Sequence, residues 1–274
     1  MTTNARKVIT IFRNKTARID GWFEDIDCLL FHVLLSFHSS NSIQGDLLEI
    51  GVYQGKSAIL LGMHLGNGEK LHACDIFDNH TDAANKIEIV NSYPQLSLGL
   101  FLENYSKVIV TTPEVYCCAS NELGKLLPDI KFRFIHIDGS HLYEHVSRDL
   151  ALAAEVIHQQ QGIIVLDDFR AEHAIGVSSA MWEMVYFHGL RPIIFTSSKA
   201  YLVPASSNLT MESLMEVLKA NSLNSEVVCI KDLDCLRVHN LSRPLHKSRR
   251  EILKQFIPPI LIQLVRVIKN KNIS

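Results

Sequence analysis

The amino-acid sequence predicts an α/β protein built on a mostly parallel β-sheet, with helices on both faces and an antiparallel hairpin at one edge. Short apolar runs alternate along the chain with longer segments whose apolar residues recur at helical spacing, which is typical of parallel sheets. Near the end of this alternation, Ser197-Ser198-Lys199 separates two strand-like runs, as in a β-hairpin. The 274 residues, 47% of them apolar, suffice for one large domain with additions.

The first 44 residues are expected to form an N-terminal helical cap. Apolar side chains recur at helical spacing over residues 20–38, and we expect Trp22 and Phe23 to pack in the core rather than cover a substrate. Residues 45–205 form the main predicted domain. Its strands are predicted over 47–52, 71–77, 115–119, 132–137 and 163–166, its helices over 55–65, 82–92, 121–127, 143–158 and 176–188, and its hairpin over 192–204.

A C-terminal extension, residues 206–274, is predicted to contain a basic amphipathic helix. From Arg243 onward the chain has eight Lys or Arg residues and one acid, Glu251. The apolar stripe of this tail is interrupted by Pro258 and Pro259. Packing of the stripe on the domain, or on a second copy of the chain in a homo-oligomer, is favoured over weak contact with a membrane surface.

The overall composition excludes some classes of protein. The formal net charge of −2 gives no reason to expect nucleic acid as a partner. The apolar runs near the N-terminus are too short for a signal peptide, and the longest of them is far below the roughly 20 residues of a membrane-spanning helix. We therefore expect a soluble, cytoplasmic protein.

Glycines mark the turn between the first predicted strand and the helix that follows. The segment 49–57 places Gly51 and Gly55 where the backbone must approach a ligand closely, and exposed backbone N–H groups there favour an electronegative group. Asp75 closes the next strand, 20 residues after Gly55, where α/β folds place an acid that accepts hydrogen bonds from ribose hydroxyls. Because Tyr53 stands where GxGxxG motifs have their middle glycine, a dinucleotide is disfavoured.

Acidic residues follow two other predicted strands. Asp138 comes after strand 132–137, and Asp167 and Asp168 come after strand 163–166. Carboxylates at the carboxyl edge of a parallel sheet lie where such sheets bind ligands, and three oxygen ligands suit Mg²⁺, or alternatively Mn²⁺. Structural roles remain as alternatives, since Asp138 would also suit a helix cap and Asp167 a turn. The convergence of three acids favours a metal site.

A histidine follows the first of these acids at short range. Gly139 permits a sharp exit from the strand, which brings His141 back toward the edge that carries Asp138. A histidine titrates near neutrality, as a general base should. His136, inside the strand, is expected to be a hydrogen-bonded core residue rather than a metal ligand.

Taken in order, these motifs resemble a class I S-adenosylmethionine-dependent methyltransferase over about residues 45–205. The resemblance implies a Rossmann-like, seven-stranded sheet and S-adenosylmethionine as cofactor. It further implies that the glycine loop lies against the methionine part of the cofactor, that Asp75 holds the ribose hydroxyls and that Ser120 lies near the adenine. The cofactor-binding residues implied in this way are Glu49, Gly51, Tyr53, Gly55, Ser57, Asp75 and Ser120.

The Asp-Gly-x-His pattern with a later acidic pair is similar to the metal-dependent sugar O-methyltransferases of macrolide biosynthesis, of the mycinamicin and macrocin type. By this resemblance Asp138, Asp167 and Asp168 would bind magnesium, and His141 would be the base. The sequence has Asp-Asp where that family has Glu-Asp or Asp-Asn, which keeps oxygen ligation.

The implied function is methyl transfer to a hydroxyl of a small molecule, such as a sugar or a glycosylated natural product. A hydroxyl is a poor nucleophile until a dication and a base such as His141 help to remove its proton, and Asp138 is counted with His141 as catalytic. Two alternatives remain open: a metal-independent methyltransferase, and a non-catalytic subunit that only binds the cofactor.

Overall fold

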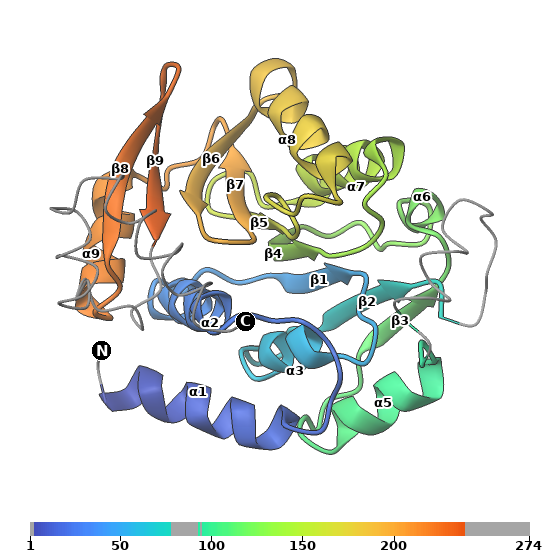
Figure 1. Cartoon of the computed structure of the whole chain (residues 1–274). Helices are drawn as coiled ribbons and strands as arrows, with labels where there is room; N and C mark the ends of the chain where they lie inside the picture. The colour runs from blue at the N-terminus through green and yellow to red at the C-terminus, as the bar shows by residue number, and fades with distance from the viewer. Residues whose placement is uncertain (1–2, 78–92, 94, 239–274) are drawn as a thin grey trace, which may run out of the picture. The chain divides into compact units, whose positions relative to one another are not determined.

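The computed structural model describes residues 3–77, 93 and 95–238, and within them it contains one mixed β-sheet (Figure 1). The strand order is β3-β2-β1-β4-β5-β7-β6-β9-β8, and the first five strands are parallel to one another. The strands are β1 (Asp46–Ile50), β2 (Leu71–Asp75), β3 (Glu114–Cys117), β4 (Phe132–Ile137), β5 (Ile163–Leu166), β6 (Leu190–Phe195), β7 (Ala200–Pro204), β8 (Ser225–Ile230) and β9 (Leu233–Val238). The predicted α/β class and the antiparallel hairpin, β6–β7, are confirmed.

The described part of the sheet has nine strands, so the expected number of seven is wrong. The two further strands, β8 and β9, pair antiparallel with each other, and β9 runs parallel to β6. They come from the extension 206–274, for which only a helix was predicted. The edge of β6 would otherwise present unpaired backbone groups, which β9 satisfies. The basic amphipathic helix of the tail and the helix predicted over 82–92 lie outside the described residues, and the domain boundaries after residues 44 and 205 remain predictions.

Helices cover both faces of the sheet, as Figure 1 shows: α1, α2, α3 and α5 lie on one side, and α7 and α8 on the other. Each face has its own apolar core, one containing Phe31 and Ile59, the other Leu150 and Met181. The helices are α1 (Thr3–Thr16), α2 (Asp25–Ser40), α3 (Lys56–Gly62), α5 (Leu98–Ser106), α6 (Ser120–Leu123), α7 (Tyr143–Val156), α8 (Ile175–Phe187) and α9 (Met211–Ala220). None of these described helices is long and apolar enough to cross a membrane.

The N-terminal cap differs from its prediction at the start of α2. The helix begins at Asp25 rather than at residue 20, with Asp25 and Asp27 in its first turn, where acids oppose the helix dipole favourably. Phe23 packs against the core as expected, but Trp22 is 71% exposed, so its assignment to the core is wrong. The Trp22 ring instead stacks on the Tyr53 ring, outside both apolar cores.

The central strands β1, β4 and β5 consist almost entirely of buried residues, which is why they appear in the sequence as continuous apolar runs. The strand order reverses between β1 and β4, since the chain proceeds outward to β2 and β3 on one side and to β5 on the other. The carboxyl ends of strands at such a switch point are where open α/β sheets bind ligands. In this fold, the residues that follow β1, β4 and β5 are therefore the expected place of a ligand site.

Candidate active site

The residues that follow β1, β4 and β5 are held side by side by backbone hydrogen bonds that continue the sheet. The N–H of Gly51 donates to the carbonyl of Cys74 at 2.8 Å, and the N–H of Asp138 donates to the carbonyl of Ile50 at 2.7 Å. The N–H of Asp167 donates to the carbonyl of Ile137 at 2.9 Å. The predicted glycine loop and the predicted acids therefore begin on adjacent strands, at one edge of the sheet.

A cavity of about 780 Å³ opens at this edge. One part of its wall is the glycine loop, including Gly51, Tyr53 and Ser57. The wall also includes the predicted catalytic and metal-binding residues, which are Asp138, His141, Asp167 and Asp168, together with His173 and Lys199. The volume lies within the roughly 300–1,000 Å³ typical of small-molecule sites. One cavity thus joins two groups of residues that the sequence could only place separately.

The glycine loop has a left-handed backbone at three positions. Gly51 has φ +84°, Tyr53 has φ +46° and Gly55 has φ +88°. A Cβ atom on Gly51 would lie 2.0 Å from the backbone oxygen of Asp138, and one on Gly55 would lie 2.7 Å from the Phe101 ring. Both glycines are thus required by neighbouring parts of the chain, whether or not a ligand is bound.

Asp75 lies against the glycine loop from the end of β2. Its Oδ2 accepts hydrogen bonds from the backbone N–H groups of Val52 and Tyr53, each at 2.9 Å, and its Oδ1 accepts from Ile76 at 2.7 Å. Burial raises the pKa of Asp75, and these backbone donors oppose the rise. The acid therefore fixes the shape of the loop, and its role in holding a ribose stays a prediction.

Ser120 begins α6, and its side chain hydrogen-bonds to Asp149. As far as the described residues form the cavity, neither Ser120 nor Asp75 belongs to its wall. Contact of Ser120 with an adenine ring therefore also stays a prediction.

Glu49 and His136 form a buried pair beneath the cavity. The Nδ1 of His136 lies 2.7 Å from Oε1 of Glu49, and both side chains are fully buried. Burial raises the pKa of Glu49 to about 8, against a hydrogen bond from Ser57. His136 is a hydrogen-bonded core residue, as predicted, and burial together with Lys199 lowers its pKa well below the ordinary value.

The raised pKa of Glu49 leads to a prediction about stability. The carboxyl group has its ordinary pKa of 4.5 when the chain unfolds and about 8 when it is folded, so unfolding releases a proton between these values and the stability that this group contributes falls as pH rises through them. Glu49→Gln has nearly the same shape and does not titrate. Relative to wild type, its melting temperature should therefore rise between about pH 5 and about pH 8.5 by several degrees, at about 2–4 °C per kcal/mol for a domain of this size. A difference in melting temperature between Glu49→Gln and wild type that does not change with pH would contradict the raised pKa of Glu49.

Lys199 enters the acidic cluster from the β6–β7 hairpin. Its side chain is 1% exposed, and its ammonium group forms an ion pair with Oδ2 of Asp167. Burial would lower the pKa of Lys199, but Asp167, Asp138 and Asp27 together raise it above its ordinary value. The sequence analysis used Lys199 only as a turn residue and missed it as part of the site.

The surroundings of Asp138, one of the three predicted metal ligands, change the pKa of its carboxyl group strongly. Burial and the neighbouring Asp167 raise its pKa well above the ordinary value, while Lys199 acts in the opposite direction. An additional positive charge at this place would offset the repulsion between the carboxylates. This is the behaviour expected of a carboxylate that lies next to a cation site.

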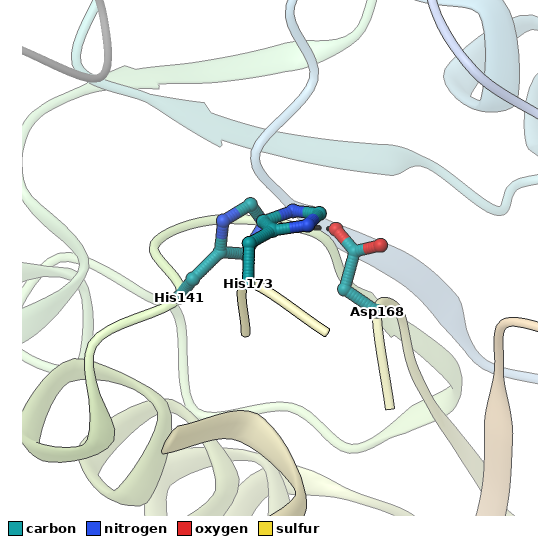
Figure 2. A group of neighbouring side chains, drawn as sticks. All are labelled: His141, Asp168 and His173. Atoms are coloured by element: carbon teal, nitrogen blue, oxygen red, sulfur yellow. Dashed lines mark ion pairs between the residues drawn. The ribbon is translucent and has the colours of Figure 1, made fainter. Parts of the chain in front are cut away.

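His141 forms an ion pair with Asp168, as the dashed line in Figure 2 marks. Its Nε2 lies 2.8 Å from Oδ2 of Asp168, and this hydrogen bond lowers the pKa of Asp168. Asp168 has φ +52°, an uncommon backbone conformation for a residue other than glycine. Donation from Nε2 makes Nδ1 the nitrogen that carries the lone pair in neutral His141. The pair therefore has the geometry of a base held in one tautomer by a carboxylate.

Figure 2 also shows His173, which the sequence analysis missed, next to the His141 ring. The two ring centroids are 5.2 Å apart. His173 follows β5 by several residues without a recognisable motif, so its only signal was its position after the acidic pair. The structure thus adds an imidazole to the place where a base was predicted.

The predicted metal ligands fall into two groups among the described residues. Asp138 and Asp167 group with His136, and Asp168 groups with His141 and His173; within each group the ligand atoms lie within 4.8 Å of one another. His136 is an unsuitable ligand, because its Nδ1 faces Glu49 and its Nε2 lies 3.2 Å from the Lys199 ammonium group. The oxygen donors of Asp138 and Asp167 suit Mg²⁺, whereas the second group would suit a transition metal.

Three aromatic side chains line the cavity on the side of the glycine loop. The Trp22 ring stacks on the Tyr53 ring with centroids 6.4 Å apart, and the Tyr93 ring lies edge-on to both. All three residues belong to the wall of the cavity. Trp22 is thus a candidate contact for a ligand, a role that the sequence analysis disfavoured.

Residues 48–169 match the sequence family described as "Methyltransferase domain". No curated protein sequence matches the chain significantly. The matched segment runs from β1 to the residue after Asp168, so it contains the glycine loop and all three predicted acids.

Several solved structures are similar to this chain. The O-methyltransferase NovP has 17% sequence identity and a TM-score of 0.54, covering 65% of this chain and 80% of NovP. The O-methyltransferase TomG from Streptomyces achromogenes, involved in tomaymycin synthesis and solved with SAM, has 13% identity and a TM-score of 0.50, covering 74% and 91%. The calicheamicin methyltransferase CalS11 has 15% identity and a TM-score of 0.50, covering 74% and 90%. At such identities the likeness establishes the shared fold.

Proposed function

We propose that the chain is a class I S-adenosylmethionine-dependent methyltransferase that methylates a hydroxyl group of a small molecule with the help of a divalent cation, and the match of residues 48–169 to a methyltransferase-domain family supports this. A sugar or a glycosylated natural product is the proposed class of acceptor. One observation carries the proposal: a single cavity of about 780 Å³ is lined both by the glycine loop and by the acidic cluster with His141. A methyl donor and an oxygen nucleophile would meet in this space.

The residues proposed to hold the cofactor are those of the loop and its surroundings. Glu49, Gly51, Tyr53, Gly55 and Ser57 belong to the loop or lie beneath it, and Asp75 and Ser120 are proposed for the ribose and the adenine. The loop suits this role because Asp75 holds its backbone in a left-handed conformation that leaves Gly51 and Tyr53 at the cavity. When bound, S-adenosylmethionine supplies the methyl group for an in-line attack.

The cation, Mg²⁺ or alternatively Mn²⁺, is proposed to bind to Asp138, Asp167 and Asp168. When all three are ionised, the carboxylates of these acids beside the Lys199 ammonium group would leave two negative charges, which a single divalent cation would neutralise. Such a cation lowers the cost of removing the acceptor proton. The donor set therefore fits a hard cation, although Asp168 also accepts a hydrogen bond from His141.

The proposed base is His141. Asp168 holds its Nε2–H, so Nδ1 would take the proton from the acceptor hydroxyl while Asp168 stabilises the resulting imidazolium. The surrounding chain contributes mainly position, because the reacting groups are brought together in one cavity. The chemistry needs no covalent intermediate on the protein.

Two titrations and one activity measurement test this function. Calorimetry should detect binding of S-adenosylmethionine and, in a second titration, of Mg²⁺. An extract incubated with the protein and methyl-labelled cofactor should yield a labelled small molecule by mass spectrometry, and EDTA should suppress the labelling at least about tenfold.

Each alternative function has its own result in these measurements. Equal turnover in EDTA and in Mg²⁺ would leave a metal-independent methyltransferase in which His141 or Asp138 acts alone. Tight cofactor binding without any labelled product would instead indicate a cofactor-binding accessory subunit. A homo-oligomer and weak membrane contact through the tail remain separate proposals, to be examined by light scattering and by flotation with anionic liposomes, with and without residues 248–274.

A further inference from the structure

Lys199 reaches the acidic cluster because of the register of the hairpin. In the antiparallel pairing of β5 with β7, Leu166 lies opposite Ala200, so the residues just beyond them, Asp167 and Lys199, are also neighbours. The turn before Lys199 is closed by its own N–H, which donates to Oγ1 of Thr196 at 2.9 Å. The position of Lys199 is therefore set by backbone pairing and not only by its long side chain.

The surroundings of the Lys199 ammonium group are closed to water and rich in negative charge. It forms the ion pair with Asp167, and it lies 3.2 Å from Nε2 of His136 and 5.4 Å from the centre of the Phe23 ring. A buried lysine is costly unless its charge is compensated. The compensating carboxylates here include two of the proposed metal ligands, Asp167 in contact and Asp138 nearby.

The same charges act on any cation that enters the site. A divalent ion bound to Asp167 would share that carboxylate with an ammonium group that cannot leave, because Lys199 is buried and held by the hairpin. Like charges at such short range repel, and the burial of Lys199 weakens the screening of this repulsion by water. The affinity of the site for a divalent ion must therefore be lower than three carboxylates alone would give.

We propose that Lys199 is a positioning residue that holds Asp167 and Asp138 ready in the absence of a divalent ion and that makes the ion weakly bound and exchangeable. This inference rests on the proposed function, since it concerns the cation of that site. Lys199 and the ion then each neutralise part of the negative charge of the acidic cluster. The ion can enter with one acceptor and leave with its product without the cluster losing its structure.

The test is cation binding to the full-length protein, measured by calorimetry with Mn²⁺ at about pH 8, where protons compete least for carboxylates. Lys199→Gln removes the charge and should bind Mn²⁺ about tenfold more tightly or better. Binding of S-adenosylmethionine, titrated separately, should be unchanged. If Lys199 had only a structural role, Lys199→Gln should bind Mn²⁺ more weakly than wild type, because damage to the cluster weakens cation binding.

Lys56→Gln is the matched control. Lys56 lies in the wall of the same cavity, but its Nζ donates to the backbone oxygen of Gly21 at 2.6 Å rather than to an acid. The same change of charge there should leave Mn²⁺ affinity as in wild type. If Lys199→Gln does not fold, as judged by circular dichroism, the double variant with Asp27→Asn removes one buried charge of each sign and should still bind Mn²⁺ more tightly than wild type.

The outcomes separate the two proposals. Equal or weaker Mn²⁺ binding by folded Lys199 variants, with clear binding by wild type, would overturn the role of Lys199 and leave the proposed function intact. Binding by no protein at all would overturn both the cation site and this inference. Binding by Lys199→Gln but not by wild type would overturn the exchangeable ion and the proposed cation site, because Lys199 would then occupy the place of the ion.

Discussion

Replacing Asp138 by alanine is expected to abolish cation-stimulated methyl transfer, with S-adenosylmethionine affinity within about twofold of wild type. Asp138 lies at the end of β4, between the glycine loop and Asp167, and burial already disfavours its charge. Its removal takes one of three proposed oxygen ligands from the cation. A loss of at least about a thousandfold in kcat is expected, and it is measured with labelled cofactor.

Asp138→Asn is the matched control for this prediction, because it keeps the shape of the side chain and removes the charge. It should lose cation-stimulated turnover nearly as fully as alanine does, while calorimetry shows intact cofactor binding and lost Mg²⁺ binding. The outcome that speaks against the proposal is full turnover by the asparagine variant. Loss of cofactor binding in both variants would instead mean that Asp138 supports the neighbouring glycine loop, since a Cβ added to Gly51 would lie only 2.0 Å from the backbone oxygen of Asp138.

The second prediction separates two histidines whose rings lie 5.2 Å apart. His141→Ala should lower kcat by about 10²–10⁴-fold, the usual contribution of a general base. His173→Ala should lower it far less, because Asp168 pairs with His141 and orients that ring. Both variants should bind S-adenosylmethionine and Mg²⁺ as wild type does.

The pattern of loss also decides between a base and a metal ligand. Parallel loss of activity and of cation binding in both histidine variants would indicate that His141, Asp168 and His173 form the metal site, with a preference for transition metals over Mg²⁺. Loss of activity only in His141→Ala, with cation binding kept, is the result that a base requires. Competition between Mg²⁺ and Zn²⁺ for binding to wild type tests independently whether the site prefers a transition metal.

Much of the fold was accessible to sequence reasoning because its signals are local. The runs around β1, β4 and β5 are apolar since both faces of these strands are covered, and their ends carry glycine or acid. Strands β8 and β9 escaped detection because their burial does not alternate clearly, with Val227 exposed and few residues in the core. A strand at the edge of a sheet takes its position from its partner more than from its own sequence.

The site was predictable only in part, because only some of its residues carry a local signal in the sequence. Asp138, Asp167 and Asp168 could be placed together because parallel strands end at one edge of the sheet. Lys199 and His173 have no fixed distance in sequence from these acids, and Trp22 comes from a segment before the first strand. Lys199 is positioned by the register of the hairpin, His173 by a loop, and Trp22 by the segment that precedes α2. None of these features leaves a periodic pattern in the sequence.

The sequence by itself determined the class of this protein, a parallel α/β sheet whose strand ends carry a glycine loop and an acidic cluster, because these features follow from period, polarity and order along the chain. Only the tertiary structure decided how the charges of that cluster are balanced. It brings the buried Lys199 ammonium group onto Asp167 and turns Asp168 toward His141. The physical reason is that electrostatic interactions depend on distance in space and on burial, which long-range pairing of strands creates and local sequence does not record.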